Sequence, residues 1–234
     1  VRTNAIWDLG GPTDDPFSVN AQGSGASAVT TDGTFTVTQG KLECLSLTSV
    51  DFDGSNDYID TNDPSGIDSA TALTASLWIK QDDTDSQLYF QKATDSSNRV
   101  HCNYDNSLGL VVNASNGGNA FGSVAAATAG FSTDGSTWNH LTMVYDGSGS
   151  GNSGRLKLYV DGILQTLSFT GTVPASLPDM GSNDFKIGSG TDASLKTDGH
   201  IRDVKIFDYA LSTDQAASLY SGSYNVTPKH GWKL

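Results

Sequence analysis

Residues 50–59 read Val-Asp-Phe-Asp-Gly-Ser-Asn-Asp-Tyr-Ile, two short apolar-polar alternations on either side of an Asp-Gly turn. Alternation with period two places successive side chains on opposite faces of a strand, and Asp, Asn and Gly favour the turn that joins two strands. The segment therefore predicts a strand, a turn rich in oxygen-bearing side chains, and a second strand.

Similar alternating runs recur about every ten residues along the chain, separated by clusters of Gly, Asp, Asn and Ser. Such spacing predicts an all-β fold of about a dozen strands in a two-sheet antiparallel sandwich. The predicted strands are 34–38, 41–52, 57–61, 73–80, 87–92, 99–104, 108–113, 138–145, 155–160, 163–169, 184–187 and 200–207.

Two local motifs are specific. Asp161-Gly162 supplies the two positive-φ positions of a type I′ turn, which predicts a hairpin over residues 155–169. Residues 210–220 read as the one helix of the chain, since Ser212 and Gln215 form a capping-box pattern and Gly222 suits the C-terminal stop.

The composition narrows the class of protein. The chain has 234 residues, 36% of them hydrophobic, a net charge of -13 and no apolar run long enough to span a bilayer. The negative charge argues against a nucleic-acid partner and against membrane insertion. Glu43 is the single Glu among 26 acidic residues, and this excess of Asp fits a loop-rich β protein.

The segment 50–59 resembles the opening motif of laminin G-like jelly-roll domains, in the concanavalin A-like lectin and glucanase superfamily. Later segments keep the order of that family: a Trp-bearing strand at 73–80, a Trp-x-His strand at 138–147, and a Leu-Tyr-apolar-Asp-Gly hairpin at 156–162. Phe-Lys-Ile-Gly at 185–188 and the closing segment 199–212 complete the set. The resemblance implies a jelly roll over residues 45–222, preceded by a packed loop and edge-strand segment, 1–44, and followed by an extension, 223–234.

The resemblance leaves function open, because the fold hosts lectins, enzyme-appended binding modules, adhesive proteins and viral appendage domains. In the closing strand, Arg202 and Asp203 replace the Asp-Glu pair that the family usually carries. Glycosidases of the superfamily need two neighbouring carboxyl groups, but Glu43 has no acid two residues away. We therefore expect no catalytic residues and no enzyme activity.

Calcium is the expected cofactor. Four side chains around the first turn carry hard oxygen donors, and the resemblance implies that the closing strand near Asp203 passes beside them. The predicted structural calcium ligands are Asp51, Asp53, Asn56, Asp57 and Asp203. The alternative is that Asp53-Gly54 is only a hairpin turn and that Asp57 pairs with Arg202 or Lys205.

Glycan binding needs exposed aromatic rings that stack on sugars. The candidates are Trp78, Tyr89, Tyr104 and Tyr159. The alternative is that each outward-facing ring packs beneath a covering loop.

Trp-x-Leu occurs near both ends, as Trp7 with Leu9 and as Trp232 with Leu234. Residues 232–234 either begin another copy of the domain or insert as a strand into this or a neighbouring subunit. The alternative is that a three-residue pattern recurs by chance. These four residues are the candidate assembly contacts, and the expected partners are a homo-oligomer or neighbouring assembly subunits, with cell-surface glycans as a further possibility.

The function predicted first is a non-catalytic laminin G-like structural or adhesion module of an extracellular or virion-surface assembly, such as a fibre, appendage or decoration protein. The alternative is a carbohydrate-binding, lectin-like module, and a glycoside-cleaving enzyme ranks last.

The start at Val1, without a charged and apolar leader, favours a mature, processed or excised segment. Cys44 and Cys102 either pair with each other or are small buried thiols.

Overall fold

A computed structural model describes residues 49–190, 195–222 and 228–232, together with the backbone of four short strands between residues 5 and 44. Of Trp232, only the backbone is described. The four short strands are β1 (Ala5–Asp8), β2 (Asn20–Ala21), β3 (Phe35–Thr38) and β4 (Lys41–Cys44). Three of them form a small antiparallel sheet in the order β1-β4-β3, and β2 pairs with β6 (Ile59–Asp60).

The larger of the two main sheets has eight strands in the order β15-β11-β10-β9-β8-β16-β6-β2. All the neighbours in it are antiparallel, so short turns can join successive strands. Its remaining members are β8 (Gln87–Asp95), β9 (Asn98–Asp105), β10 (Gly109–Asn116), β11 (Phe121–Val124), β15 (Ser168–Thr170) and β16 (Lys186–Ile187).

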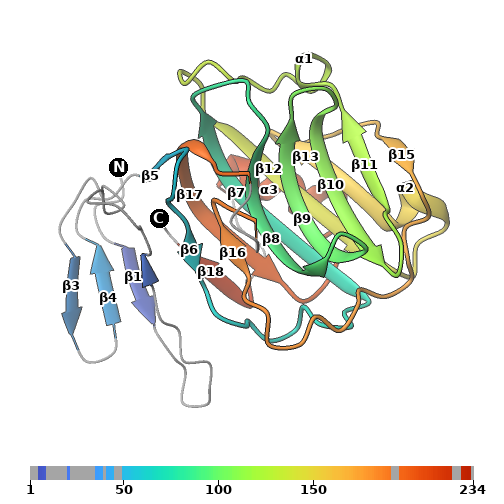
Figure 1. The fold of residues 1–234 in the computed structure, drawn as a ribbon, viewed down its shortest axis with the longest axis horizontal. Helices are drawn as coiled ribbons and strands as arrows, with labels where there is room; N and C mark the ends of the chain where they lie inside the picture. The colour runs from blue at the N-terminus through green and yellow to red at the C-terminus, as the bar shows by residue number, and fades with distance from the viewer. Residues whose placement is uncertain are drawn as a thin grey trace.

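The other sheet has seven strands, in the order β14-β13-β12-β7-β17-β18, with β5 also paired to β17. Figure 1 shows the two sheets stacked face to face, with the green strands of the eight-stranded sheet nearer the viewer. The predicted two-sheet antiparallel sandwich is therefore confirmed. The strands of this sheet are β5 (Val50–Asp53), β7 (Ala72–Gln81), β12 (Asn139–Asp146), β13 (Leu156–Val160), β14 (Ile163–Leu164), β17 (Asp198–Phe207) and β18 (His230–Trp232).

The core lies between the sheets and is built from the apolar side of each alternation. Phe52, Leu77, Val112 and Ile201 have no exposed surface, and Phe90 stacks on Phe185 at 5.4 Å between ring centroids. Cys102 belongs to the same core and is a free thiol, whose pKa burial raises. Cys44 lies outside the residues whose side chains the structure describes.

A second, smaller apolar cluster lies on the outer face of the seven-stranded sheet, where helix α3 (Thr213–Ser221) covers it. Ser212 accepts a hydrogen bond from the Gln215 backbone, and the Gln215 side chain accepts one from the Ser212 backbone, so the predicted capping box is present. Gly222 ends the helix in the left-handed conformation, at φ 74°. The two other helices, α1 (Ala126–Ala129) and α2 (Gly151–Arg155), are single turns.

The predicted hairpin at Asp161-Gly162 forms, with φ of 50° and 77° at the two turn residues. Its second strand is shorter than predicted, because β14 ends at Leu164 and residues 168–170 cross to the other sheet and pair with β11. Among the described residues, no helix is long and apolar enough to cross a bilayer.

Candidate functional site

The predicted calcium turn keeps its oxygen atoms close together. Asp53 Oδ1 accepts backbone hydrogen bonds from Ser55 at 2.9 Å and Asn56 at 3.3 Å, and Asp57 Oδ2 accepts one from the Asp53 backbone at 3.2 Å. Asn56 Oδ1 and Asp57 Oδ1 are buried and accept no hydrogen bond. Burial raises the pKa of Asp57, and the backbone hydrogen bond from Asp53 opposes that rise. Two unsatisfied buried oxygens are a fit for a hard cation.

The closing strand passes beside this turn, but with Asp198 rather than Asp203. In the β5–β17 ladder, Asp198 pairs with Asp53 and Ile201 pairs with Val50, so Asp203 lies further along the strand. Asp203 forms an ion pair with Lys205 at 2.5 Å. Within the described ranges, no three acidic, histidine or cysteine side chains converge so as to hold a metal ion.

Three of the four aromatic candidates cannot stack on a sugar, because the structure buries them. Tyr89 lies in the core and donates a hydrogen bond to Gln81 Oε1 at 2.5 Å. Tyr104, also buried, stacks against Phe131 at 6.2 Å between ring centroids. Tyr159 lies beneath α3, where its hydroxyl is 3.1 Å from Thr213 Oγ1. These three predicted binding residues are therefore packing residues.

Trp78 is partly exposed on the outer face of the seven-stranded sheet, but neighbouring side chains pack against its ring. The Tyr220 ring lies 5.6 Å and the His140 ring 5.1 Å from it. The Arg202 guanidinium lies between two indoles, 5.1 Å from the centroid of Trp78 and 4.3 Å from that of Trp138. This arrangement is a stacked aromatic-cation cluster rather than an open platform.

The terminal Trp-x-Leu segments have different places. Trp7 lies in β1 and pairs with Leu42, whereas Trp232 lies in β18 and pairs with Val204 of the same chain. The C-terminal segment thus adds a strand to the edge of its own sheet. Leu9 and Leu234 lie outside the described residues.

A row of side chains crosses the outer face of the eight-stranded sheet, on the side away from the core. Strand register places Gln91 of β8 beside Lys186 of β16 and His101 of β9, and His101 beside Asn113 of β10. Asn113 is in turn paired with Phe121 of β11. Neighbouring strands are about 4.8 Å apart, so these side chains lie at regular intervals across the sheet.

This face is hollowed into a groove of about 460 Å³. Gln91, His101 and Asn103 lie on its floor, each less than a tenth exposed, while Leu108 and Leu195 are prominently exposed at its rim. The other lining residues are Leu88, Ala93, Thr94, Asp95, Ser96, Arg99, Asp105, Val111, Asn113, Phe121 and Gly190. Polar and apolar side chains are thus mixed in the lining of the groove, a chemistry suited to a small polar ligand.

The imidazole on the floor of the groove is neutral at physiological pH, although Arg99 also lines the groove. Burial and the nearby positive charge of Arg99 lower the pKa of His101 to about 3, so its imidazole is uncharged. The His101 Nδ1 lies 3.5 Å from the Gln91 side-chain nitrogen. A side-chain hydrogen bond with Asn103 opposes this lowering of the His101 pKa. Arg99 Nε is buried without a hydrogen-bond partner. The amide and imidazole groups of the lining suit a ligand that carries hydroxyl or carboxylate groups.

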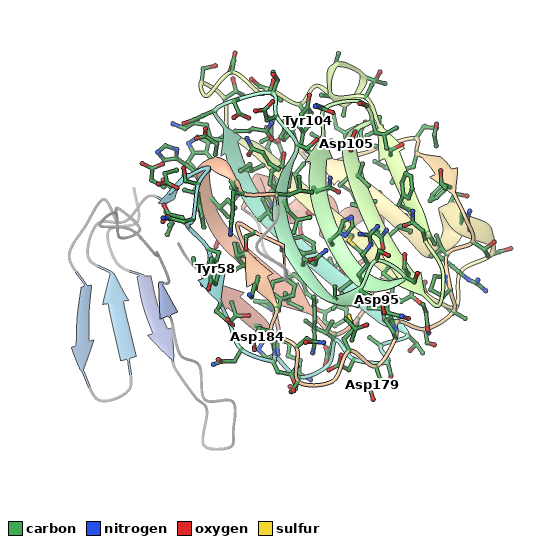
Figure 2. The ribbon with its side chains drawn as sticks, in the orientation of Figure 1. Tyr58, Asp95, Tyr104, Asp105, Asp179 and Asp184 are labelled. Carbon is green, nitrogen blue, oxygen red and sulfur yellow. The ribbon has the colours of Figure 1, made fainter. Side chains whose placement is uncertain are left out.

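The carboxylates of the groove do not form a hydrolytic pair. Asp95 pairs with Asn98 at one end of β9, and Asp105 ends the same strand, so about 23 Å of strand separates the two positions. Figure 2 shows these two labelled residues at opposite ends of the sheet. Glycoside hydrolysis requires carboxyl groups about 5 to 10 Å apart.

Sequence reasoning missed the groove, although its signal is present. Residues 99, 101 and 103 alternate with the core residues 100, 102 and 104, and they are Arg, His and Asn. The pattern shows which side chains share a face, but it does not show which side chains of the neighbouring strands lie beside them.

Asn113 also begins an Asn-x-Ser glycosylation pattern. Its side chain, however, is fully buried, and Ser115 donates a hydrogen bond to its Oδ1 at 2.7 Å.

A protein-family model described as the concanavalin A-like lectin/glucanases superfamily matches residues 53–217. Domain 4 of AbnA, an extracellular arabinanase from Geobacillus stearothermophilus solved with arabinotriose, is similar at 17% identity, with 88% of each chain covered and a TM-score of 0.53. The CBM40 of the Ruminococcus gnavus IT-sialidase, solved with α2,3-sialyllactose, shares 12% identity over 74% of this chain and 95% of its own, at a TM-score of 0.54.

The binding domain of botulinum neurotoxin serotype G is also similar, with 13% identity over 88% of this chain and 50% of that one, at a TM-score of 0.54. No match is found among curated protein sequences. At these identities, the structural likenesses establish a shared fold.

Proposed function

This chain belongs to the concanavalin A-like lectin/glucanase superfamily, and on that premise we propose that it is a non-catalytic carbohydrate-binding module. We place its ligand in the groove on the outer face of the eight-stranded sheet. The observation that carries the proposal is the hollow itself, about 460 Å³ and lined by hydrogen-bonding side chains, the neutral Gln91, His101 and Asn103 among them.

The chemistry of the groove supports a glycan. Sugars present many hydroxyl groups that both donate and accept, and amide and imidazole side chains do the same. Gln91, His101 and Asn103 offer such groups on adjacent strands, and Val111 and Leu108 give apolar surface beside them. The separation of Asp95 from Asp105 supports binding without cleavage.

The structural neighbours support the same class of ligand. The AbnA domain was solved with arabinotriose and the sialidase module with α2,3-sialyllactose, and both share the fold of this chain. The arabinanase that contains the first is extracellular. We therefore propose that this module acts outside the cell, on glycans that it encounters there.

The test is a glycan array followed by calorimetric titration of the glycans that bind. We expect submillimolar binding, weakened at least tenfold by Asn103→Ala and by His101→Ala, since each removes a group from the floor of the groove. His200→Ala, on the outer face of the other sheet, is the matched control and should bind as the wild type does. Binding that survives both groove variants would overturn this placement.

Calcium at the first turn remains a proposal that the buried oxygens of Asn56 and Asp57 support. Asp51 and Asp53 would add negative charge there, and backbone carbonyls or waters would complete the six to eight oxygen ligands that the ion prefers. A bound ion would compensate the two unsatisfied oxygens and stabilise the turn. We expect millimolar calcium to raise the Tm and EDTA to lower it, with Asp57→Asn abolishing the response. Melting curves that neither reagent moves would remove the site.

An assembly role is the second candidate, as a structural or adhesion module of an extracellular or virion-surface particle. The pairing of β18 with β17 favours it, because a C-terminal strand that adds to a sheet edge can add equally to the same edge of a neighbouring subunit. Mass photometry should then reveal oligomers that disappear when residues 228–234 are deleted. A strictly monomeric particle would exclude this role.

A further inference from the structure

Arg99 is the one cationic side chain that lines the groove within the described residues. It lies on β9, where register places it between Ala93 of β8 and Ser115 of β10. Its side chain is only partly exposed. The guanidinium therefore stands at one end of the groove floor, near the β8–β9 turn.

Side chains of the neighbouring loop and strand fix the position of this guanidinium. Its Nη2 donates to Asn119 Oδ1 at 3.1 Å, and the same oxygen accepts from Asn113 Nδ2 at 3.2 Å. Asn113 is held in turn by Ser115. A charged donor that is held in place by a network loses little side-chain entropy when a ligand binds.

The charge of Arg99 has no anion of its own. Among the described residues, no carboxylate lies within ion-pair distance of it, and its Nε is buried without an acceptor. Asp95 is the nearby acid that favours its charged form. The oxygens of Asp95, however, are taken by its own turn, where they accept from the Ser97 backbone at 2.7 Å and the Asn98 amide at 3.0 Å.

Burial opposes the charged form and lowers the pKa of Arg99, although a guanidinium stays protonated at any physiological pH. A partly desolvated cation without a partner is costly, and a planar guanidinium matches a carboxylate with two parallel hydrogen bonds. Hydroxyl groups alone would leave this charge uncompensated.

We infer that the groove selects glycans that carry a carboxylate, of the uronic-acid or sialic-acid class, and that Arg99 binds this carboxylate. The inference rests on the proposed glycan-binding function and specifies its ligand. The opposite end of the groove carries Asp105, and the chain has a net charge of -13, so a densely charged polyanion would be repelled. The ligand is therefore a glycan with sparse or single acidic sugars.

The test uses two matched pairs of probes at constant ionic strength: sialyllactose with its methyl ester, and a neutral oligosaccharide that carries one glucuronic acid with its methyl ester. The carboxylate form of at least one pair should bind at least tenfold more tightly than its ester. Arg99→Gln should abolish this preference and Arg99→Lys should keep part of it. Lys80→Gln removes one positive charge from the other sheet and should leave it intact. Melting curves of each variant check that the fold is retained.

The outcomes separate this inference from the proposed function. Three results would overturn the role of Arg99 and leave the glycan-binding proposal standing. The first is that neutral glycans bind while neither acid does, and the second is that an acid binds no better than its ester. The third is that Arg99→Gln keeps the wild-type preference for the acid. Failure of every glycan on the array, neutral and acidic, would overturn both.

Discussion

The outer faces of the two sheets differ in whether their larger side chains are covered by other parts of the chain. On the seven-stranded sheet, α3 covers Tyr159 and Phe207, and Arg202 is stacked between Trp78 and Trp138. On the eight-stranded sheet, the corresponding face carries amides, an imidazole and a guanidinium over an open hollow. On the seven-stranded sheet the outward aromatic residues therefore serve packing, and the polar side chains in register across the eight-stranded sheet form the proposed binding site.

The covered face should respond to mutation as a core does. Tyr159→Ala removes a fully buried ring from beneath α3 and its hydroxyl contact with Thr213. We expect a loss of about 3 to 5 kcal/mol in the free energy of unfolding, measured by denaturant titration. Tyr159→Phe keeps the ring and should cost about 1 kcal/mol. A glycan affinity that falls in Tyr159→Phe while stability holds would contradict the assignment of this residue to packing.

The comparison also shows where sequence reasoning succeeds. The capping box at Ser212 and Gln215 and the turn at Asp161-Gly162 depend on residues that are close together in the chain, and both were predicted correctly. The outward direction of Tyr159 was also correct, because alternation fixes the face. What covers that face was not predictable, since α3 follows more than fifty residues later and its docking is a matter of tertiary packing.

The same limit explains the candidate site. Alternation places Arg99, His101 and Asn103 on one face of a strand, but Gln91 and Asn113 join them only through the sheet order β10-β9-β8. These three strands are consecutive hairpins, but the register within each hairpin, with its shifts between β8 and β9, decides which side chains lie side by side, and the alternation alone does not give that register. The cluster of oxygen donors at the first turn could be predicted because all four lie within seven residues. The position of Asp203 relative to this turn depends on the register of β17 against β5, which the sequence pattern does not give.

Two arginines, one on each outer face, should respond differently to mutation. Arg202→Ala removes a cation that contacts two indole rings, and we expect a loss of about 1 to 2 kcal/mol in stability with unchanged glycan affinity. Arg99→Ala should weaken the binding of acidic glycans and leave stability nearly unchanged, because burial opposes the charged form of Arg99 and Asp95 offsets only part of that cost. Thermal melting and titration of the same two variants measure both effects. Equal losses of stability would end the distinction between the faces.

The smallest expected effect concerns a pair of acids at the far side of the eight-stranded sheet, where Asp60 of β6 lies beside Asp184. Figure 2 labels Asp184 near Tyr58, at the end of the sheet away from β15. Burial, followed by the charge and hydrogen bond of Asp60, raises the pKa of Asp184 in the folded protein. The folded state therefore holds this proton more tightly than the unfolded state, and stability is lost as the pH rises through the two pKa values.

Asp184→Asn removes that loss without changing the size of the side chain. We expect its Tm to exceed that of the wild type by about 1 to 3 °C at pH 7, and the advantage to vanish below about pH 3, where the carboxyl is protonated in both states. Asp85→Asn, which changes an exposed carboxyl, is the control and should shift the Tm little at either pH. An advantage of Asp184→Asn that is the same at both pH values would mean that the amide gains from a new hydrogen bond, and not from relief of repulsion with Asp60.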